Sequence, residues 1–186
     1  MVGAAVGLVV TSPALALAAI GIKLEDRGPL LFRQRRVGQN GEEFELLKLR
    51  TMTVGAEHEG AGYAVDRGDP RITRVGRVLR RLSIDELPQL WNVVRGEMSV
   101  IGPRPTLRYQ VEKYDERQLH RLDVKPGITG WAQIHGRASL PWAERIELDL
   151  WYVRHHDWKT DLLILARTPL ALFGGTYKGK TGGWTG

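Results

Sequence analysis

Two adjacent acids, Asp85 and Glu86, lie in the part of the chain that is richest in residues capable of chemistry. Arg80 shortly precedes the pair, and Arg104 follows it between two prolines. The prolines fix the backbone φ angle beside Arg104 and lower the entropy lost on binding. A carboxylate among cations suits chemistry on phosphates, because cations hold the anionic substrate. The pattern therefore indicates a site for phosphorylated ligands.

The two carboxylates are expected to have different roles. Adjacent helix residues point about 100° apart, so Asp85 and Glu86 do not form a facing pair. One carboxylate can attack phosphorus to give an acyl-phosphate, while the other holds Mg²⁺ that neutralises phosphate charge. The cations available for the phosphates are Arg80, Arg104, Lys48, Arg50 and Arg137.

Each of these residues also has a simpler explanation when it is taken alone. An acid at a helix N-terminus is most often a cap, and a single arginine most often serves surface solubility. The chain has no cysteine, which excludes thiolate nucleophiles and cysteine zinc sites, and its net charge of +6 indicates anionic partners. Its histidines lack metal-ligand spacing, and it has no phosphate-loop lysine motif, dinucleotide fingerprint or serine elbow.

The elements expected to position the acid pair are two helices. An amphipathic helix over Arg74 to Leu82 carries a basic face that includes Arg74, and a second helix runs from Asp85 to Val94. With Asp85 as N-cap, Pro88 falls on an amide position that is unpaired in any helix. The positive helix end is then expected to keep Asp85 ionised.

Other elements follow from alternation, periodicity and turn residues. Two strands, Leu30 to Val37 and Glu43 to Leu49, form a hairpin that ends in the exposed cations Lys48 and Arg50. The glycines beside Trp131 indicate a close backbone approach, either to another strand or to a ligand. The remaining expectations are a loop over 55–70, a charged, solvent-facing helix over 106–122, a helix over 142–155, an interfacial or core helix over 161–173 and a frayed tail after 173.

The N-terminal segment carries no charged residue between Val2 and Ile22, a run long enough to cross a bilayer. Basic residues that follow it place the next domain on the cytoplasmic side. Pro13 removes an amide donor and Ser12 can bond the freed carbonyl, so a sharp bend is expected. A straight spanning helix and a helix that enters and returns both remain open, and a cleaved signal peptide lacks its basic n-region.

These motifs resemble the bacterial sugar transferases, which are monotopic phosphoglycosyl transferases. The resemblance covers nearly the whole chain. It is most specific in the two stretches Asp85-Glu86-Leu87-Pro88-Gln89 and Gly102-Pro103-Arg104-Pro105.

The resemblance implies a reaction and roles for particular residues. Asp85 would attack the β-phosphorus of a UDP-sugar and release UMP, and polyprenyl (undecaprenyl) phosphate would then take the phosphosugar. Glu86, with Asp85, would hold Mg²⁺. The cations around the phosphates and nucleotide would be Arg80, Lys48, Arg104 and Arg137, and the re-entrant break would lie at Ser12 and Pro13.

The resemblance also implies an α+β fold. A re-entrant membrane helix over 1–22 would precede a small, mostly helical catalytic domain over 23–174 with a short β-hairpin and interfacial helices, and 175–186 would form a flexible tail. The domain would face the cytoplasm at the bacterial inner membrane. Its reaction would be the first membrane step of polysaccharide or glycoconjugate assembly. Members usually carry a basic lead-in before the membrane segment, and this chain begins inside it, which is consistent with a truncated or internal start.

Two rival functions stay open. One is a glycosyltransferase that would release UDP rather than UMP, and the other is a non-enzymatic module that binds anionic lipid or nucleic acid through its basic face. The paired acid argues against the second, and no nucleic acid partner is expected. The sugar and the oligomeric state, including a homodimer, are not specified by the sequence.

Overall fold

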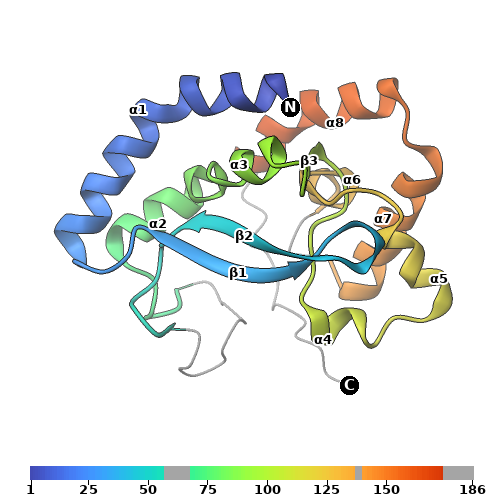
Figure 1. The fold of residues 1–186 in the computed structure, drawn as a ribbon, viewed down its shortest axis with the longest axis horizontal. Coiled ribbons are helices and arrows are strands. Elements are labelled where there is room, and N and C mark those ends of the chain that lie inside the picture. Colours follow the sequence, from blue (N-terminus) through green and yellow to red (C-terminus); the bar gives the residue numbers. More distant parts are fainter. Residues whose placement is uncertain (57–67, 137–139, 174–186) are drawn as a thin grey trace.

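The computed structural model describes residues 1–56, 68–136 and 140–173, which combine many helices with two small sheets (Figure 1). The expected mixture of helix and strand is confirmed. In chain order the elements are α1 Val2–Glu25, β1 Leu31–Val37, η1 Gln39–Gly41, β2 Glu43–Leu49, α2 Arg74–Arg81, η3 Ile84–Glu86, α3 Gln89–Val94, β3 Ser99–Ile101, α4 Arg108–Val111, α5 Glu116–Leu119, η4 His120–Leu122, β4 Gly127–Thr129, α6 Trp131–Ile134, α7 Trp142–His155 and α8 Trp158–Phe173.

Helix α1 is long and apolar enough to cross a membrane, and it changes direction between its two halves (Figure 1). Pro13 lies inside the helix and cannot donate a hydrogen bond to the carbonyl of Val9. Ser12 Oγ donates to that carbonyl instead, at 2.8 Å. The expected bend is confirmed, and the side chain of Ser12 compensates the bond that Pro13 removes.

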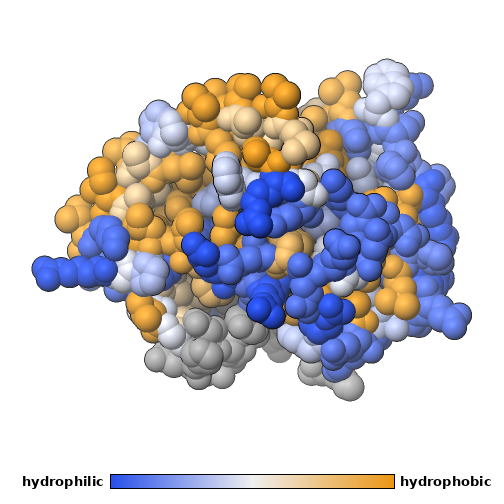
Figure 2. All heavy atoms as spheres, in the orientation of Figure 1, coloured by the Kyte–Doolittle hydropathy of each residue, from blue (hydrophilic) through white to orange (hydrophobic). Residues whose placement is uncertain are grey.

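Both halves of α1 pack against the rest of the chain. Ala4, near the N-terminus, is buried in a cluster with Val93 and Met98. Ile22, near the other end, is buried with Leu79 and other apolar side chains. The opposite side of α1 is an exposed apolar surface, and Figure 2 shows its apolar side chains gathered along the upper left edge of the molecule. The exposed side chains include Val6, Val9, Val10, Leu17, Ile20 and Leu24.

The expected hairpin is confirmed as the antiparallel pair of β1 and β2, with Leu31 opposite Leu49. Asn92, fully buried on α3, joins that helix to β2. Its Nδ2 donates to the carbonyl of Glu45 at 2.7 Å, and its Oδ1 accepts from the amide of Leu47 at 3.1 Å. These two bonds fix α3 beside the strand that carries Lys48.

The second sheet pairs β3 and β4 in parallel, and it depends on glycine. A Cβ atom on Gly102 would lie 2.4 Å from the carbonyl oxygen of Lys125, and one on Gly130 would lie 2.2 Å from that of Gly102. The close backbone approach expected beside Trp131 is therefore confirmed, and its partner is another segment of the chain.

The expected continuous helix over 106–122 is wrong. The chain forms the short turns α4, α5 and η4 instead, with Asp115 capping α5 by accepting from the amide of Gln118 at 2.7 Å. The segment is mainly solvent-facing, as expected, with Arg108, Glu112 and Glu116 among its exposed residues, although Arg121 is buried. A cap in the middle of the segment starts a new helix, so charge and helix propensity alone did not predict the break.

The helices expected over 74–82 and 142–155 are confirmed as α2 and α7. The expected helix over 161–173 begins earlier, at Trp158, and packs against α6, β3 and β4. One side of it is buried through Ile164, while Leu162 and Leu170 on the other side are exposed. The expected tail lies outside the described residues, and so does most of the expected loop over 55–70.

Gly76 provides a test of how α2 packs. A Cβ atom there would lie 2.1 Å from the carbonyl oxygen of Thr51, and backbone cannot move aside cheaply. We expect Gly76→Ala to lower the free energy of unfolding by roughly 1–3 kcal/mol through overpacking. Thermal unfolding in detergent measures this loss of stability. Gly3→Ala, whose added atom meets nothing within 4 Å, is the matched helical control; equal stability of the two variants would contradict the packing.

Candidate active site

The acid pair lies on the tight turn η3 rather than on a long helix. Ser83 takes a left-handed conformation with φ of 54° and ends the preceding helix. The carbonyl of Ile84 then accepts from the amide of Leu87 at 3.2 Å, because Pro88 has no amide proton to offer it. The expected helix from Asp85 with Asp85 as N-cap is therefore wrong. The α-helix begins only at Gln89, and Pro88 is its N-cap.

Glu86 accepts from two cations that come from distant segments. Lys48 Nζ on β2 lies 3.0 Å from Glu86 Oε1, and Arg104 Nη2 lies 2.5 Å from the same oxygen. The side chains of Glu86 and Lys48 are 14% and 19% exposed, so the pair is well shielded from water. Burial alone would raise the pKa of Glu86, but Arg104 and Lys48 hold that pKa far below its ordinary value.

Asp85 is the more buried acid, with 7% of its surface exposed. Within the described part of the chain, no hydrogen bond or ion pair reaches its carboxylate. Burial raises the pKa of Asp85, and the charge of Glu86 raises it further, against the opposing effect of Lys48, Arg80 and Arg104. The expected stabilisation of ionised Asp85 by a helix end is therefore not what sets its pKa: burial and Glu86 raise it, and nearby cations oppose that rise.

The structure brings together most of the predicted site residues. Arg80 lies on α2 and its Nε donates to Thr51 Oγ1 at 2.8 Å, while its charge acts on Asp85. Arg50 is neither exposed nor part of the cluster, because its Nη2 donates to the carbonyl of Asp26 at 2.8 Å and its side chain is 8% exposed. Lys48 is likewise shielded rather than exposed. Arg137 lies outside the described residues.

A divalent cation has a limited set of ligands here. Asp85 and Glu86 offer adjacent carboxylates, and no cluster of three or more acidic, histidine or cysteine side chains occurs over residues 1–56, 68–136 and 140–173. Mg²⁺ in phosphate sites is usually held by one or two carboxylates together with substrate phosphates and water. The acid pair fits that mode of binding, and it does not fit an all-protein cage.

Sequence reasoning missed several residues that shape the site. Thr51 holds Arg80, and Asn92 sets the distance between α3 and the strand of Lys48. Arg121 donates to the backbone of Arg104, and Asp149 holds Arg121. The sequence gives only the residue types at these positions. A polar residue that is buried beside a partner cannot be told from a polar residue at the surface by its type alone.

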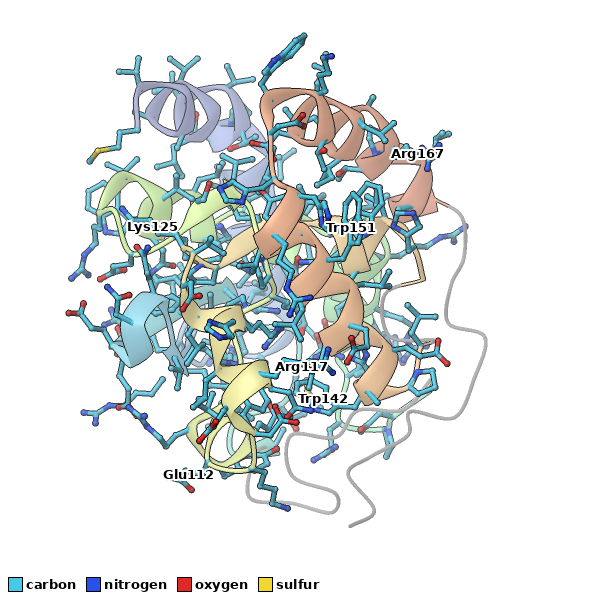
Figure 3. The ribbon with its side chains drawn as sticks, turned by 90° about the vertical axis from the view of Figure 1, so that its right-hand side faces the viewer. Glu112, Arg117, Lys125, Trp142, Trp151 and Arg167 are labelled. Carbon is cyan, nitrogen blue, oxygen red and sulfur yellow. The ribbon has the colours of Figure 1, made fainter. Side chains whose placement is uncertain are left out.

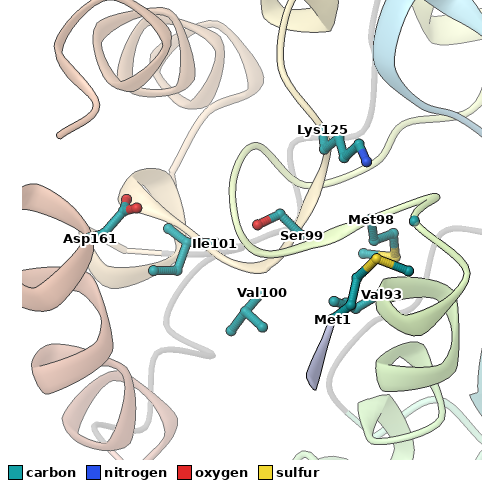
Figure 4. A pocket seen from close by; sticks show the side chains of 9 residues that line it. Met1, Val93, Met98, Ser99, Val100, Ile101, Lys125 and Asp161 are labelled. Atoms are coloured by element: carbon teal, nitrogen blue, oxygen red, sulfur yellow. The ribbon is translucent and has the colours of Figure 1, made fainter. Parts of the chain in front are cut away.

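A separate cavity of about 290 Å³ lies between the start of α1, β3 and the start of α8 (Figure 4). Met1 and Met98 line one side of it, and Ile101 and Asp161 line the other, with Lys125 at its edge. None of the predicted site residues that the structure describes lines this cavity. The acid pair and its cations therefore remain the candidate active site.

Comparisons with known proteins show which family the chain resembles. The sequence matches the family model described as "Bacterial sugar transferase" over residues 1–175. It is 44% identical, over 85% of this chain and 77% of the relative, to the uncharacterized sugar transferase EpsL of Bacillus subtilis.

Two relatives have more specific names. The UDP-N-acetylgalactosamine-undecaprenyl-phosphate N-acetylgalactosaminephosphotransferase of Aeromonas hydrophila is 42% identical over 90% of this chain and 41% of its own. The undecaprenyl-phosphate glucose phosphotransferase of Komagataeibacter xylinus is 46% identical over 87% of this chain and 32% of its own. The chain thus spans less than half the length of these two relatives. With the family model matching nearly its whole length, the chain belongs to the bacterial sugar transferase family.

Proposed function

We propose that the chain transfers a sugar-1-phosphate from a UDP-sugar to polyprenyl (undecaprenyl) phosphate and releases UMP. The observation that carries the proposal is the buried carboxylate of Asp85, which makes no hydrogen bond or ion pair with the described residues, beside Glu86, which two cations hold ionised. The names of the two relatives, which combine undecaprenyl phosphate with a sugar phosphotransferase, support the same reaction.

The reaction proceeds in two displacements at phosphorus. A carboxylate oxygen of Asp85 attacks the β-phosphorus of the donor, forming an acyl-phosphate bond as the bond to the bridging oxygen breaks and UMP leaves. A phosphate oxygen of the acceptor then attacks the same phosphorus, which breaks the bond to Asp85 and restores its carboxylate. The product is a polyprenyl-diphospho-sugar. Lys48, Arg80 and Arg104 lie where they can offset the charge of the phosphates.

Asp85 has the environment of a nucleophile rather than that of a tightly bound ion. Because its carboxylate makes no hydrogen bond with described residues, attack on phosphorus does not require breaking one. Glu86 already shares its oxygens with Lys48 and Arg104, so it stays fixed and charged. Two adjacent acids with pKa values displaced in opposite directions are suited to different roles.

Mg²⁺ completes the proposal, with Glu86 and Asp85 as its protein ligands. When bound, it would supply further neutralisation of the charge on the transferring phosphate. The side chains of Glu86 and Lys48 do not depend on it for their positions, since they already contact each other.

The proposed setting is the cytoplasmic face of the inner membrane, with α1 re-entrant. Two observations support it: Pro13 lies at the bend, and both halves of α1 pack against the same domain. A straight helix leaving along the membrane normal would carry one half away from the domain. Ile84, which adjoins Asp85, packs in the cluster that contains Ala18 of α1, so the acid pair lies near the membrane segment.

Removal of the nucleophile tests the proposal directly. We expect Asp85→Asn to lower release of UMP by at least roughly 10³-fold, since the amide cannot form the acyl-phosphate. The assay offers a panel of UDP-sugars with undecaprenyl phosphate and measures the nucleotide released. Asp123→Asn, which makes the same change at a side chain 58% exposed, is the matched control.

Two results would contradict the proposed reaction. Activity of Asp85→Asn at the wild-type level would rule out a covalent intermediate, and release of UDP in place of UMP would indicate transfer of the sugar alone. Mass spectrometry of wild-type protein quenched with donor only should find a phosphosugar on the peptide that contains Asp85.

The pH dependence tests the role of Lys48. Asp85 must be ionised to attack, and its raised pKa means that activity falls as the pH drops through that pKa. Lys48 lowers the pKa of Asp85, so we expect Lys48→Met to move the acid limb of kcat/KM to higher pH. Lys159→Met, on α8, is the control and should leave the limb in place. An unmoved limb in Lys48→Met would show that Lys48 does not act on the nucleophile.

The topology of α1 is testable because the chain has no cysteine. We expect Val2→Cys and Asp123→Cys to be protected from a membrane-impermeant thiol reagent in intact cells, and to react in inverted membrane vesicles. Reaction of Val2→Cys from outside the cell, with Asp123→Cys still protected, would show that α1 spans the membrane.

A further inference from the structure

The segment from Pro103 to Thr106, which carries Arg104, is held at each of its backbone carbonyls. Two prolines restrict its backbone, and donors from other parts of the chain fix the rest. Gly127 N donates to the carbonyl of Pro103 at 2.8 Å, Arg121 Nη2 to that of Arg104 at 2.6 Å, Arg36 Nη1 to that of Pro105 at 3.2 Å and Val37 N to that of Thr106 at 2.9 Å.

Arg121 stands out among these donors because its side chain is 4% exposed. Its Nε donates to Asp149 Oδ2 at 2.7 Å, and its Nη1 donates to the hydroxyl of Tyr114 at 2.7 Å and to Thr106 Oγ1 at 3.3 Å. Its Nη2 is left for the carbonyl of Arg104. The guanidinium therefore joins α7, the turn after α4 and the segment of Arg104 at one point.

A buried ion pair is a costly way to fill this position. Desolvating Arg121 and Asp149 can offset most of their attraction, and apolar side chains of similar volume often serve stability as well. Burial alone would lower the pKa of Arg121, but the charge of Asp149 raises that pKa, so the arginine stays charged. Apolar side chains, however, have no hydrogen-bond donor. Only the planar guanidinium can direct an N–H group at the carbonyl of Arg104 while it also binds Asp149.

The packing leaves the segment little freedom to move. The cavity lined by Arg104, Thr106 and Arg121 has a volume of only about 10 Å³, which is room for one water at most. In front of the segment, Arg104 Nη2 reaches Glu86. The side chain of Arg104 is 44% exposed, so its direction is fixed mainly through its backbone and through Glu86. Figure 3 shows the neighbouring surface, with Arg117 and Trp142 between α5 and α7.

We infer that Arg121, held by Asp149, is a positioning residue for Arg104. It makes no contact with Asp85 or Glu86 in the described part of the chain, so it acts on the reaction through Arg104 alone. The inference rests on the proposed function, since it assigns Arg121 to the phosphate-binding cation of that site.

A double-mutant cycle tests the inference on release of UMP from UDP-glucose and UDP-N-acetylgalactosamine. We expect Arg121→Lys, which keeps the charge but loses the fork, to lower kcat/KM by roughly 10-fold to 100-fold, as small misplacements of a catalytic group do. In a background that carries Arg104→Lys, the same substitution should cost less than about 3-fold, because its target is already altered. A merely structural role would lower activity equally in both backgrounds.

A control substitution separates the effect on Arg104 from a general loss of packing between α5 and α7. Arg117→Lys is the matched control, because Arg117 pairs with Glu147 and thereby joins α5 to α7 at the surface. Arg117→Lys should leave kcat/KM unchanged.

If circular dichroism shows that Arg121→Lys is unfolded, Tyr114→Phe is used in its place. It removes one anchor of the guanidinium and should lower kcat/KM several-fold, again without further loss beside Arg104→Lys. Equal losses in both backgrounds, or wild-type kinetics for a folded variant, would overturn the inference. Failure of the proposed function is a different result, because wild-type protein would then release no UMP.

Discussion

The carboxylate of Glu86, shared between Lys48 and Arg104, is the contact on which the site depends. It joins a strand, a tight turn and a proline-bound segment that lie far apart in the sequence. Because both cations act on Glu86, its negative charge is compensated even in a shielded position. Asp85 next to it is left without a bonded partner among the residues that the structure describes. The two acids have similar ordinary pKa values. Their opposite pKa shifts therefore arise from the positions of the neighbouring charged side chains.

The rest of the fold holds the three segments at the distances that this contact needs. Asn92 binds the backbone of β2 and so fixes the strand of Lys48 beside α3. Thr51 holds Arg80, and Gly76 allows α2 to approach the backbone of Thr51 closely enough for that bond. On the other side, Arg121 connects the segment of Arg104 to α7. Each of the three segments is therefore held by a buried polar side chain, and that side chain forms its hydrogen bond with a residue of another element.

Local patterns in the sequence were sufficient to predict the hairpin, α2, α7 and the bend at Pro13. They were not sufficient where one residue changes which bonds are available. Pro88 has no amide proton, so the chain around Asp85 forms a tight turn, and Asp115 caps a new helix inside a segment that looks continuous. The charge of Arg50 and Arg121 predicted exposed side chains, and both are buried. The carbonyl and carboxylate partners that allow their burial lie elsewhere in the sequence. The acid pair itself was predictable because its residues are adjacent, whereas the roles of its neighbours required the fold.

The position of the acid pair under α1 connects the membrane segment to the chemistry. Ile84 packs with Ala18 and Ile22 of α1, and the next residue is Asp85, the proposed nucleophile, so a shift of α1 would act directly on its position. Gly7 and Gly21 bring the two halves of that helix close to Leu90 and Val75, where an added Cβ atom would lie 3.3 Å and 3.2 Å from the nearest side-chain atom. Under the proposed function, the acceptor's phosphate is anchored at the membrane surface by its lipid, and it must reach the same phosphorus that Asp85 has attacked. In that proposal, a bent helix that packs on the domain at both ends would keep the depth of Asp85 constant relative to the membrane surface. A water-soluble donor and a lipid acceptor could then react at one carboxylate.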